Sequence, residues 1–248
     1  MGCGLAVLWA TACTEITTPL RAGFYGYSLI ASDVVAQDTI IDGVSYIAGD
    51  TITDTLDFAW PASHTVKIWV QDTVGLPGHL QAAVAAWRNV LQYGELTATF
   101  VSDSSHADII VRGSAPPPAP VAGAMRLDAP MEIPPPAACE GVTDVFVSTP
   151  DHTKLWTPIQ MHVIPKYALA DPLTVPCLAR VSIHELGHAL GLFKHSPDTL
   201  DIMHTFPYTS VTAPSDGDAT TILTLYHQRS DLRPAPATDT LPATASRP

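Results

Sequence analysis

Basic residues are scarce in this chain of 248 residues, which has 12 Lys and Arg against 24 Asp and Glu. The resulting net charge of −12 leaves no basic patch of the kind that binds nucleic acid or an anionic membrane, so neither partner is expected. Long apolar runs are also missing, and without about 18 consecutive apolar residues no transmembrane segment is expected. Apolar residues nevertheless make up 46% of the chain, which is enough to build a core and excludes a fully disordered protein.

The N-terminal residues 1–13 form a short apolar run that ends in Ala-Thr-Ala-Cys. This ending resembles a bacterial lipoprotein signal whose lipidated residue would be Cys13. The run lacks the Lys or Arg that begins an export signal, so a plain apolar N-terminus is the alternative. We expect an extracytoplasmic protein, secreted or held at the cell envelope by a lipid anchor.

Cysteine is rare as well, with four residues in the chain. Cys3 and Cys13 belong to the N-terminal run, whereas Cys139 and Cys177 lie in the body of the sequence. An oxidising compartment would let Cys139 and Cys177 form a disulfide, and two buried thiols are the alternative. Neither residue belongs to a Cys-x-x-Cys pair, so a cysteine-bound zinc is not expected.

The composition divides the remaining chain into three parts. Residues 14–59 are rich in Thr, Ile, Val and Asp and predict short strands at Thr39–Ile41 and Val44–Ile47, in an N-terminal extension to which no role is assigned. Residues 60–230 predict one main domain, and we expect it to be a monomer. Residues 231–248 are rich in Pro, Ala and Thr and predict a disordered tail.

Within the main domain, strand, helix, strand and strand follow one another, which is an α/β opening. The ranges are Thr65–Val70, His79–Tyr93, Thr97–Val101 and Asp108–Val111. Proline is dense over residues 114–138, where only Ala124–Leu127 could pair as a strand. Val142–Ser148 and Ile159–Ile164 then predict a hairpin near the sheet edge.

Two further helices complete the prediction. The first has Thr174 as its cap and Pro176 in its first turn, and it runs to Gly191. The second follows a capping box at Ser215 and Asp218.

The segment from His184 to His195, His-Glu-Leu-Gly-His-Ala-Leu-Gly-Leu-Phe-Lys-His, carries the chemistry. His184 and His188 stand one helical turn apart, so both imidazoles project from one face at a separation that a single Zn²⁺ can bridge. Gly191 permits the left-handed residue that stops the helix, so that His195 can return as a third ligand. No Glu follows Glu185 in the chain, which leaves His195 as the third ligand, with Asp198 and Asp201 as alternatives.

Three protein nitrogens leave the fourth zinc position open for water, as in catalytic sites. Glu185, next to the first ligand, is placed to act as general base toward that water and then as general acid toward the departing amine. The expected function is therefore a zinc metalloendopeptidase, a hydrolase that cleaves peptide bonds of protein substrates through a metal-bound water activated by Glu185. Calcium also remains open from the acidic loops, although no Asp-x-Asp-x-Asp-Gly loop supports it.

These motifs resemble the metzincin zinc peptidases, and Ser196 after the third histidine resembles the matrixin branch. The resemblance covers about residues 65–228 and implies that Met203 forms the Met-turn beneath the metal. It also implies a zincin-like α/β (α+β) fold, in which a twisted mixed sheet with one antiparallel edge strand packs on two helices and a C-terminal helix follows the Met-turn. We expect Val142–Ser148 to be that edge strand, with substrate added to it as a further strand.

Two other functions share these residues. One is a surface-tethered zinc-binding or interaction protein with little turnover, in which the proline-rich segment covers the cleft; the intact Glu185 argues against it. The other is a zinc hydrolase acting on a different amide. The scattered residues His106, His152 and His162 are expected to be solvated or hydrogen-bonded histidines and not ligands of a second zinc.

Overall fold

The computed structural model describes residues 25–41, 43–73, 75–115, 124–126, 138–207 and 209–235. The described residues form three α-helices, α1 (Leu76–Val90), α2 (Thr174–Ala189) and α3 (Asp216–Tyr226), and a 3₁₀ turn at Ser104–His106. The strands are β1 (Leu29–Val34), β2 (Thr39–Ile41), β3 (Val44–Tyr46), β4 (Thr51–Leu56), β5 (Thr65–Val70), β6 (Thr97–Phe100), β7 (Ile109–Arg112), β8 (Ala124–Arg126), β9 (Cys139–Phe146), β10 (Lys154–Leu155), β11 (Ile159–Pro165) and β12 (Arg233–Pro234).

A six-stranded mixed sheet in the order β6-β5-β7-β11-β9-β8 is the centre of the fold. β5, β6, β7 and β11 are parallel, and β9 is antiparallel to both of its neighbours. The predicted antiparallel strand is therefore present, but its assignment to the edge was wrong for Asp144–Phe146. β8 lies outside it and pairs with Asp144–Phe146, because the short run at Ala124–Arg126 folds back against β9.

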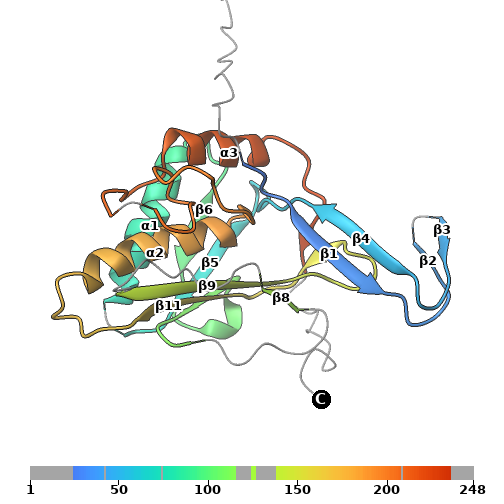
Figure 1. Cartoon of the computed structure of the whole chain (residues 1–248), viewed down its shortest axis with the longest axis horizontal. Coiled ribbons are helices and arrows are strands. Elements are labelled where there is room, and N and C mark those ends of the chain that lie inside the picture. The colour runs from blue at the N-terminus through green and yellow to red at the C-terminus, as the bar shows by residue number, and fades with distance from the viewer. Residues whose placement is uncertain are drawn as a thin grey trace, which may run out of the picture.

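Two helices pack on this sheet, as predicted. α2 contacts β9 and β11, and α1 contacts α2 and β5. Figure 1 shows α2 lying along β9, with α3 on the far side of α2 from the sheet. The core between these layers is continuous and includes Trp60, Trp87 and Leu178, each at most 2% exposed. The result is a mixed α/β fold in which α2 is enclosed on several sides.

α1 begins earlier than the predicted His79–Tyr93. Its buried residues recur at helical spacing from Leu76 through Leu80 and Val84 to Trp87. Pro77 and Gly78, which suggested a turn before the helix, instead form its first turn, where proline costs no hydrogen bond. The turn before the helix is made at Gly75, whose φ of 73° is left-handed.

The N-terminal cap predicted for α2 was wrong, whereas the one predicted for α3 is confirmed. Thr174 is the first residue inside α2 and does not cap it; the carboxylate of Asp171 accepts a hydrogen bond from the N–H of Leu173 just before the helix. The α3 capping box is confirmed, since the side chain of Ser215 accepts from the N–H of Asp218 and the Asp218 side chain accepts from the N–H of Ser215.

Residues 25–59 are joined to the main domain and not appended to it. Tyr25, Tyr27, Leu29 and Phe58 belong to the same buried cluster as α1 and α2, so a boundary at residue 60 does not divide the core. Beyond this junction β1 and β4 form an antiparallel ribbon, and β2 and β3, at the two predicted short strands, pair with each other at its far end. Figure 1 shows this ribbon projecting from the side of the sheet.

The predicted disordered tail was wrong for its first residues. β12 pairs in parallel with β10, and Leu232 and Ala235 are 2% and 5% exposed. These residues are ordered because their apolar side chains are buried against the rest of the protein. The proline-rich composition of the segment does not indicate such burial. Residues 236–248, residues 1–13 with Cys13, and most of the proline-dense segment lie outside the described residues. No helix in the described ranges is long and apolar enough to cross a membrane.

Candidate metal centre

α2 presents His184 and His188 on one face of its C-terminal half. The two residues are one turn apart, both are 0% exposed, and their Nε2 atoms lie 3.0 Å apart. The ring centroids are separated by 4.7 Å with the rings nearly perpendicular. The helix alone therefore brings two ring nitrogens to one point inside the protein.

Backbone carbonyls determine which nitrogen of each ring carries the proton. Nδ1 of His184 lies 2.7 Å from the carbonyl oxygen of Ile202, and Nδ1 of His188 lies 2.5 Å from that of Leu192. A carbonyl can only accept, so each Nδ1–H donates and each neutral ring keeps its lone pair on Nε2. Two lone pairs facing each other at 3.0 Å repel, and a cation between them turns that repulsion into coordination.

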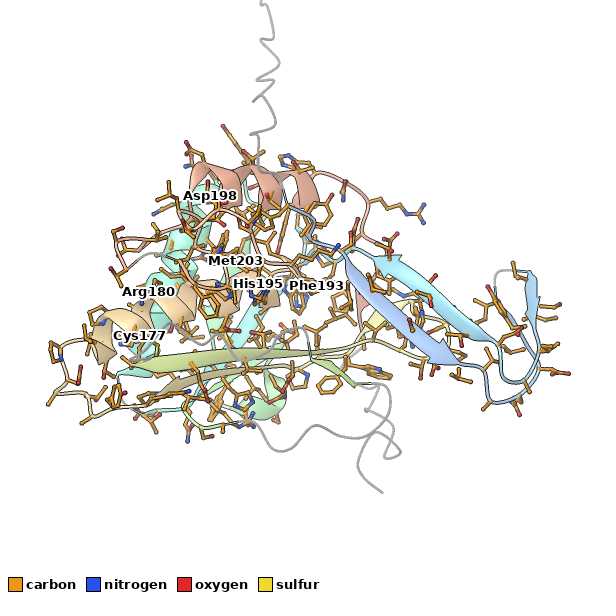
Figure 2. All side chains as sticks on the ribbon, in the orientation of Figure 1. Cys177, Arg180, Phe193, His195, Asp198 and Met203 are labelled. Carbon is orange, nitrogen blue, oxygen red and sulfur yellow. A yellow bond between two sulfur atoms is a disulfide. The ribbon has the colours of Figure 1, made fainter. Side chains whose placement is uncertain are left out.

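His195 reaches the same point because the chain reverses at Gly191. Gly191 has a φ of 110°, and the N–H groups of Gly191 and Leu192 bond back to the carbonyls of His188 and Gly187. The ring centroid of His195 lies 5.2 Å from that of His184 and 5.1 Å from that of His188. Figure 2 shows His195 beyond the C-terminal end of α2, close to Met203.

The three histidines are the one cluster in the described ranges whose donor atoms could hold a metal ion, with all three atoms within 4.8 Å of one another. Tetrahedral zinc with Zn–N bonds of about 2.0–2.1 Å needs nitrogens about 3.3 Å apart, so the residues fit such an ion. Asp198 and Asp201, the alternative third ligands, are not in the cluster. Their carboxylates accept hydrogen bonds from the N–H of Leu200 and the hydroxyl of Ser196, respectively.

Glu185 lies between α2 and β9 and is 0% exposed. Its Oε2 accepts a hydrogen bond of 2.7 Å from the hydroxyl of Thr143 on β9. A Cβ added at Gly141 on the same strand would overlap Oε1 of Glu185 and lie 2.6 Å from its Cδ. The carboxylate therefore occupies a space that β9 leaves open, and its residue directly follows the first ligand of the cluster in α2.

Met203 packs against α2 at Gly187 and is 0% exposed. A Cβ added at Gly187 would overlap the sulfur of Met203 and lie 2.8 Å from Cζ2 of Trp87. The N–H of Ser196 donates to the carbonyl of Met203 at 2.9 Å, which ties the turn to the residue after His195. The methionine thus supports the segment that carries the third histidine.

Asp218 holds this turn from α3. Its carboxylate accepts hydrogen bonds from the N–H groups of Ile202 and Met203 at 2.8 and 3.2 Å, and from the hydroxyl of Tyr25 at 2.8 Å. Burial raises the pKa of Asp218, and its hydrogen bonds offset this only in part. Burial, followed by the charge of Asp218, raises the pKa of Tyr25, so this phenol stays protonated as the donor.

The Tyr25 hydroxyl predicts loss of stability in alkali. In the unfolded chain it ionises near pH 10, whereas the folded protein keeps its proton, so its contribution is complete below pH 10 and is lost as pH rises further. The free energy of unfolding should fall by up to about 1.4 kcal/mol per pH unit from this group. Urea unfolding between pH 9 and pH 11.5 measures it: Tyr25→Phe should flatten the slope, while Tyr93→Phe, at an 84% exposed site, should not. Equal slopes in both variants would contradict the assignment.

A disulfide joins Cys139 of β9 to Cys177 of α2, the pair expected from the sequence. Both residues are buried. The bond ties the start of the strand that contacts Glu185 to the first turns of the helix that carries it. Figure 2 shows Cys177 at the N-terminal end of α2, with Arg180 one turn further along the helix.

Four residues that contact the site were not predicted from the sequence, namely Gly141, Thr143, Gly187 and Asp218. A glycine within a strand indicates that another group approaches closely, so Gly141 carried a readable signal. Asp218 was recognised only as a helix cap. Thr143 had no signal, because its contact with Glu185 joins residues 42 positions apart.

The remaining histidines named above are hydrogen-bonded within the described structure, as predicted. His152 lies 2.7 Å from a carboxylate oxygen of Asp54, and His162 lies 2.6 Å from the carbonyl oxygen of Ser114. His106 is exposed, with Nδ1 3.2 Å from Asp103. None of them belongs to the metal-binding cluster.

No family model matches this chain, and no curated protein matches it. Among solved structures, a chain in the crystal structure of myroilysin is similar to it, with 14% sequence identity and a TM-score of 0.37. The match covers 68% of this chain and 86% of that chain. Likeness at this level carries no argument about the site, whose chemistry follows from its own side chains.

Proposed function

We propose that this chain is a zinc-dependent endopeptidase with a metzincin-type site, in which His184, His188 and His195 hold the metal and Glu185 is the general base. The observation that carries the proposal is the convergence of the buried Nε2 atoms of His184 and His188, 3.0 Å apart, with each Nδ1 directed at a backbone carbonyl. This arrangement fits a divalent ion bound by neutral imidazoles.

Glu185 and the number of ligands argue against a purely structural zinc site. A structural zinc has four protein ligands, whereas this cluster supplies three, and the residue that follows its first ligand in α2 is a buried glutamate. When bound, zinc supplies an acidified water as nucleophile and polarises the scissile carbonyl. Glu185 accepts the proton of the attacking water and passes it to the leaving amine.

A peptide substrate is supported by the sheet next to the site. Within the described ranges β8 pairs only with Asp144–Phe146, so the outer edge of β9 from Cys139 to Thr143 continues beyond that pairing. An extended peptide can add to such an edge through backbone hydrogen bonds. The same strand contacts Glu185, so a peptide bound there would lie near the general base.

The disulfide supports an extracytoplasmic location, secreted or lipid-anchored, because disulfides persist in oxidising compartments. Lipidation at Cys13 is part of this proposal, and mass spectrometry of protein extracted from the envelope tests it.

Metal analysis and hydrolysis of unfolded casein test the proposed function. We expect about one zinc per purified chain, cleavage of casein, loss of at least about 100-fold in rate after chelation, and recovery on adding zinc. Magnesium and calcium serve as control ions and should not restore the rate. A chain that holds zinc but cleaves no unfolded protein would contradict the proposal of a peptidase. A peptide-library cleavage profile would distinguish a peptidase from a zinc hydrolase that acts on another amide.

A further inference from the structure

One face of β9 and one face of α2 meet residue by residue beside the metal site. Alternate residues of a strand share a face, and residues four apart on a helix share a face. The three strand residues are Cys139, Gly141 and Thr143, and the three helix residues are Cys177, Val181 and Glu185.

The three contacts differ in kind. At the first position Cys139 and Cys177 are covalently joined. At the second, a Cβ on Gly141 would lie 2.5 Å from Cγ1 of Val181, so the strand and helix approach as closely as glycine allows. The disulfide and the close approach therefore fix which strand residues lie opposite which helix residues.

The third contact is made to the carboxylate of Glu185. The hydroxyl of Thr143 lies 2.7 Å from Oε2 and 3.1 Å from the main-chain carbonyl of the same residue. Both acceptors within reach of the hydroxyl therefore belong to Glu185, and the shorter distance is to the carboxylate. Thr143 is itself 0% exposed. Oε1 faces the backbone of Gly141. Both carboxylate oxygens are thus oriented by β9.

We infer that Thr143 is a positioning residue for the general base: its hydroxyl holds Oε2 of Glu185, so the carboxylate keeps the orientation in which it serves the reaction. The inference rests on the proposed function. Rotation about the last side-chain bond of glutamate is soft, so packing alone does not define the carboxylate plane. A β-branched side chain with a restricted χ1 is suited to fix it. Gly141 and the disulfide bring Thr143 within reach.

Two substitutions separate the hydroxyl from the shape of Thr143. Thr143→Val keeps the volume and removes the donor, whereas Thr143→Ser keeps the donor. For a peptide substrate we expect Thr143→Val to lower kcat by about 10- to 100-fold with KM changed less than about threefold, and Thr143→Ser to retain kcat within about threefold. Zinc content should remain at about one per chain in both variants. Thr99→Val, at an exposed position of β6, is the control and should match the wild type.

Glu185→Ala provides a background in which the hydroxyl has nothing to position. There, adding Thr143→Val should lower kcat by less than about twofold, because the two residues act as one unit. A kcat for Thr143→Val equal to that of the wild type would overturn the inference. So would an equal loss in Thr143→Val and Thr143→Ser, or the same loss with and without Glu185.

Failure of the proposed function gives a different result, namely a zinc-loaded wild type with no hydrolysis. The positioning role is then decided by crystal structures of the zinc-loaded variants. The Glu185 carboxylate should be turned in Thr143→Val and unchanged in Thr143→Ser. An unchanged carboxylate in Thr143→Val would overturn the inference without any activity measurement.

Discussion

Glu185→Gln should lower kcat for peptide hydrolysis by about two to four orders of magnitude while zinc stays bound. The amide has nearly the same shape, so it keeps its place against Gly141 and can still accept the hydrogen bond of Thr143 through its oxygen. It cannot accept a proton at neutral pH, so the role of general base is lost. Steady-state kinetics with a fluorogenic peptide and metal analysis of the same samples measure the effect.

Glu95→Gln is the matched control for this substitution. Glu95 is buried as well, but it follows α1, where its carboxylate accepts a hydrogen bond of 2.7 Å from the N–H of Tyr93 and lies 3.2 Å from Nε2 of His227. The control makes the same change at a carboxylate whose partners lie outside the histidine cluster, so kcat should change by less than about twofold. If Glu185→Gln keeps the wild-type rate, the assignment of the base is wrong. If it loses its zinc, the residue contributes to the metal site and not only to proton transfer.

The histidine cluster was predictable because its geometry is local. Four-residue spacing on a helix determines that His184 and His188 share a face, and this holds whatever the rest of the fold does. A glycine three residues later provides the reversal that returns His195, and its φ of 110° shows that reversal. Thr143, which contacts Glu185, and Tyr25, which contacts Asp218, come from distant segments. A single sequence contains no pattern that predicts these contacts.

The same distinction explains the errors in the fold. Periodicity predicted β5, β7 and the capped α3, whose signals lie within the element itself. The edge of the sheet was misassigned because β8 is a three-residue strand, and its partner in the described ranges, β9, begins more than ten residues later in the chain. β12 was missed for the same reason, since its two residues gain order from β10 and from buried neighbours. Composition describes a segment in isolation, and these segments depend on their partners.

Gly191→Ala should destabilise the protein by about 3–5 kcal/mol and weaken zinc binding at least about tenfold. A φ of 110° is unfavourable for any residue with a Cβ, and here the added atom would also overlap the carbonyl oxygen of Phe58. It would also lie 3.0 Å from Cδ2 of Leu225, which is 0% exposed. The substitution therefore combines backbone strain with overpacking. Urea unfolding of the chelated protein measures the stability, and competition with a chromophoric chelator measures the zinc affinity.

Gly94→Ala separates the two causes. Gly94 follows α1 with a φ of 88°, but a Cβ there meets nothing within 4 Å, so this variant carries the backbone strain alone and should cost about 1–2 kcal/mol. It should leave zinc affinity unchanged, because no histidine of the cluster depends on that turn. Equal losses of stability in the two variants would show that Phe58 and Leu225 can move aside. Full zinc affinity in Gly191→Ala would show that His195 reaches the metal without the tight reversal, and that the cluster is held by the Met203 turn instead.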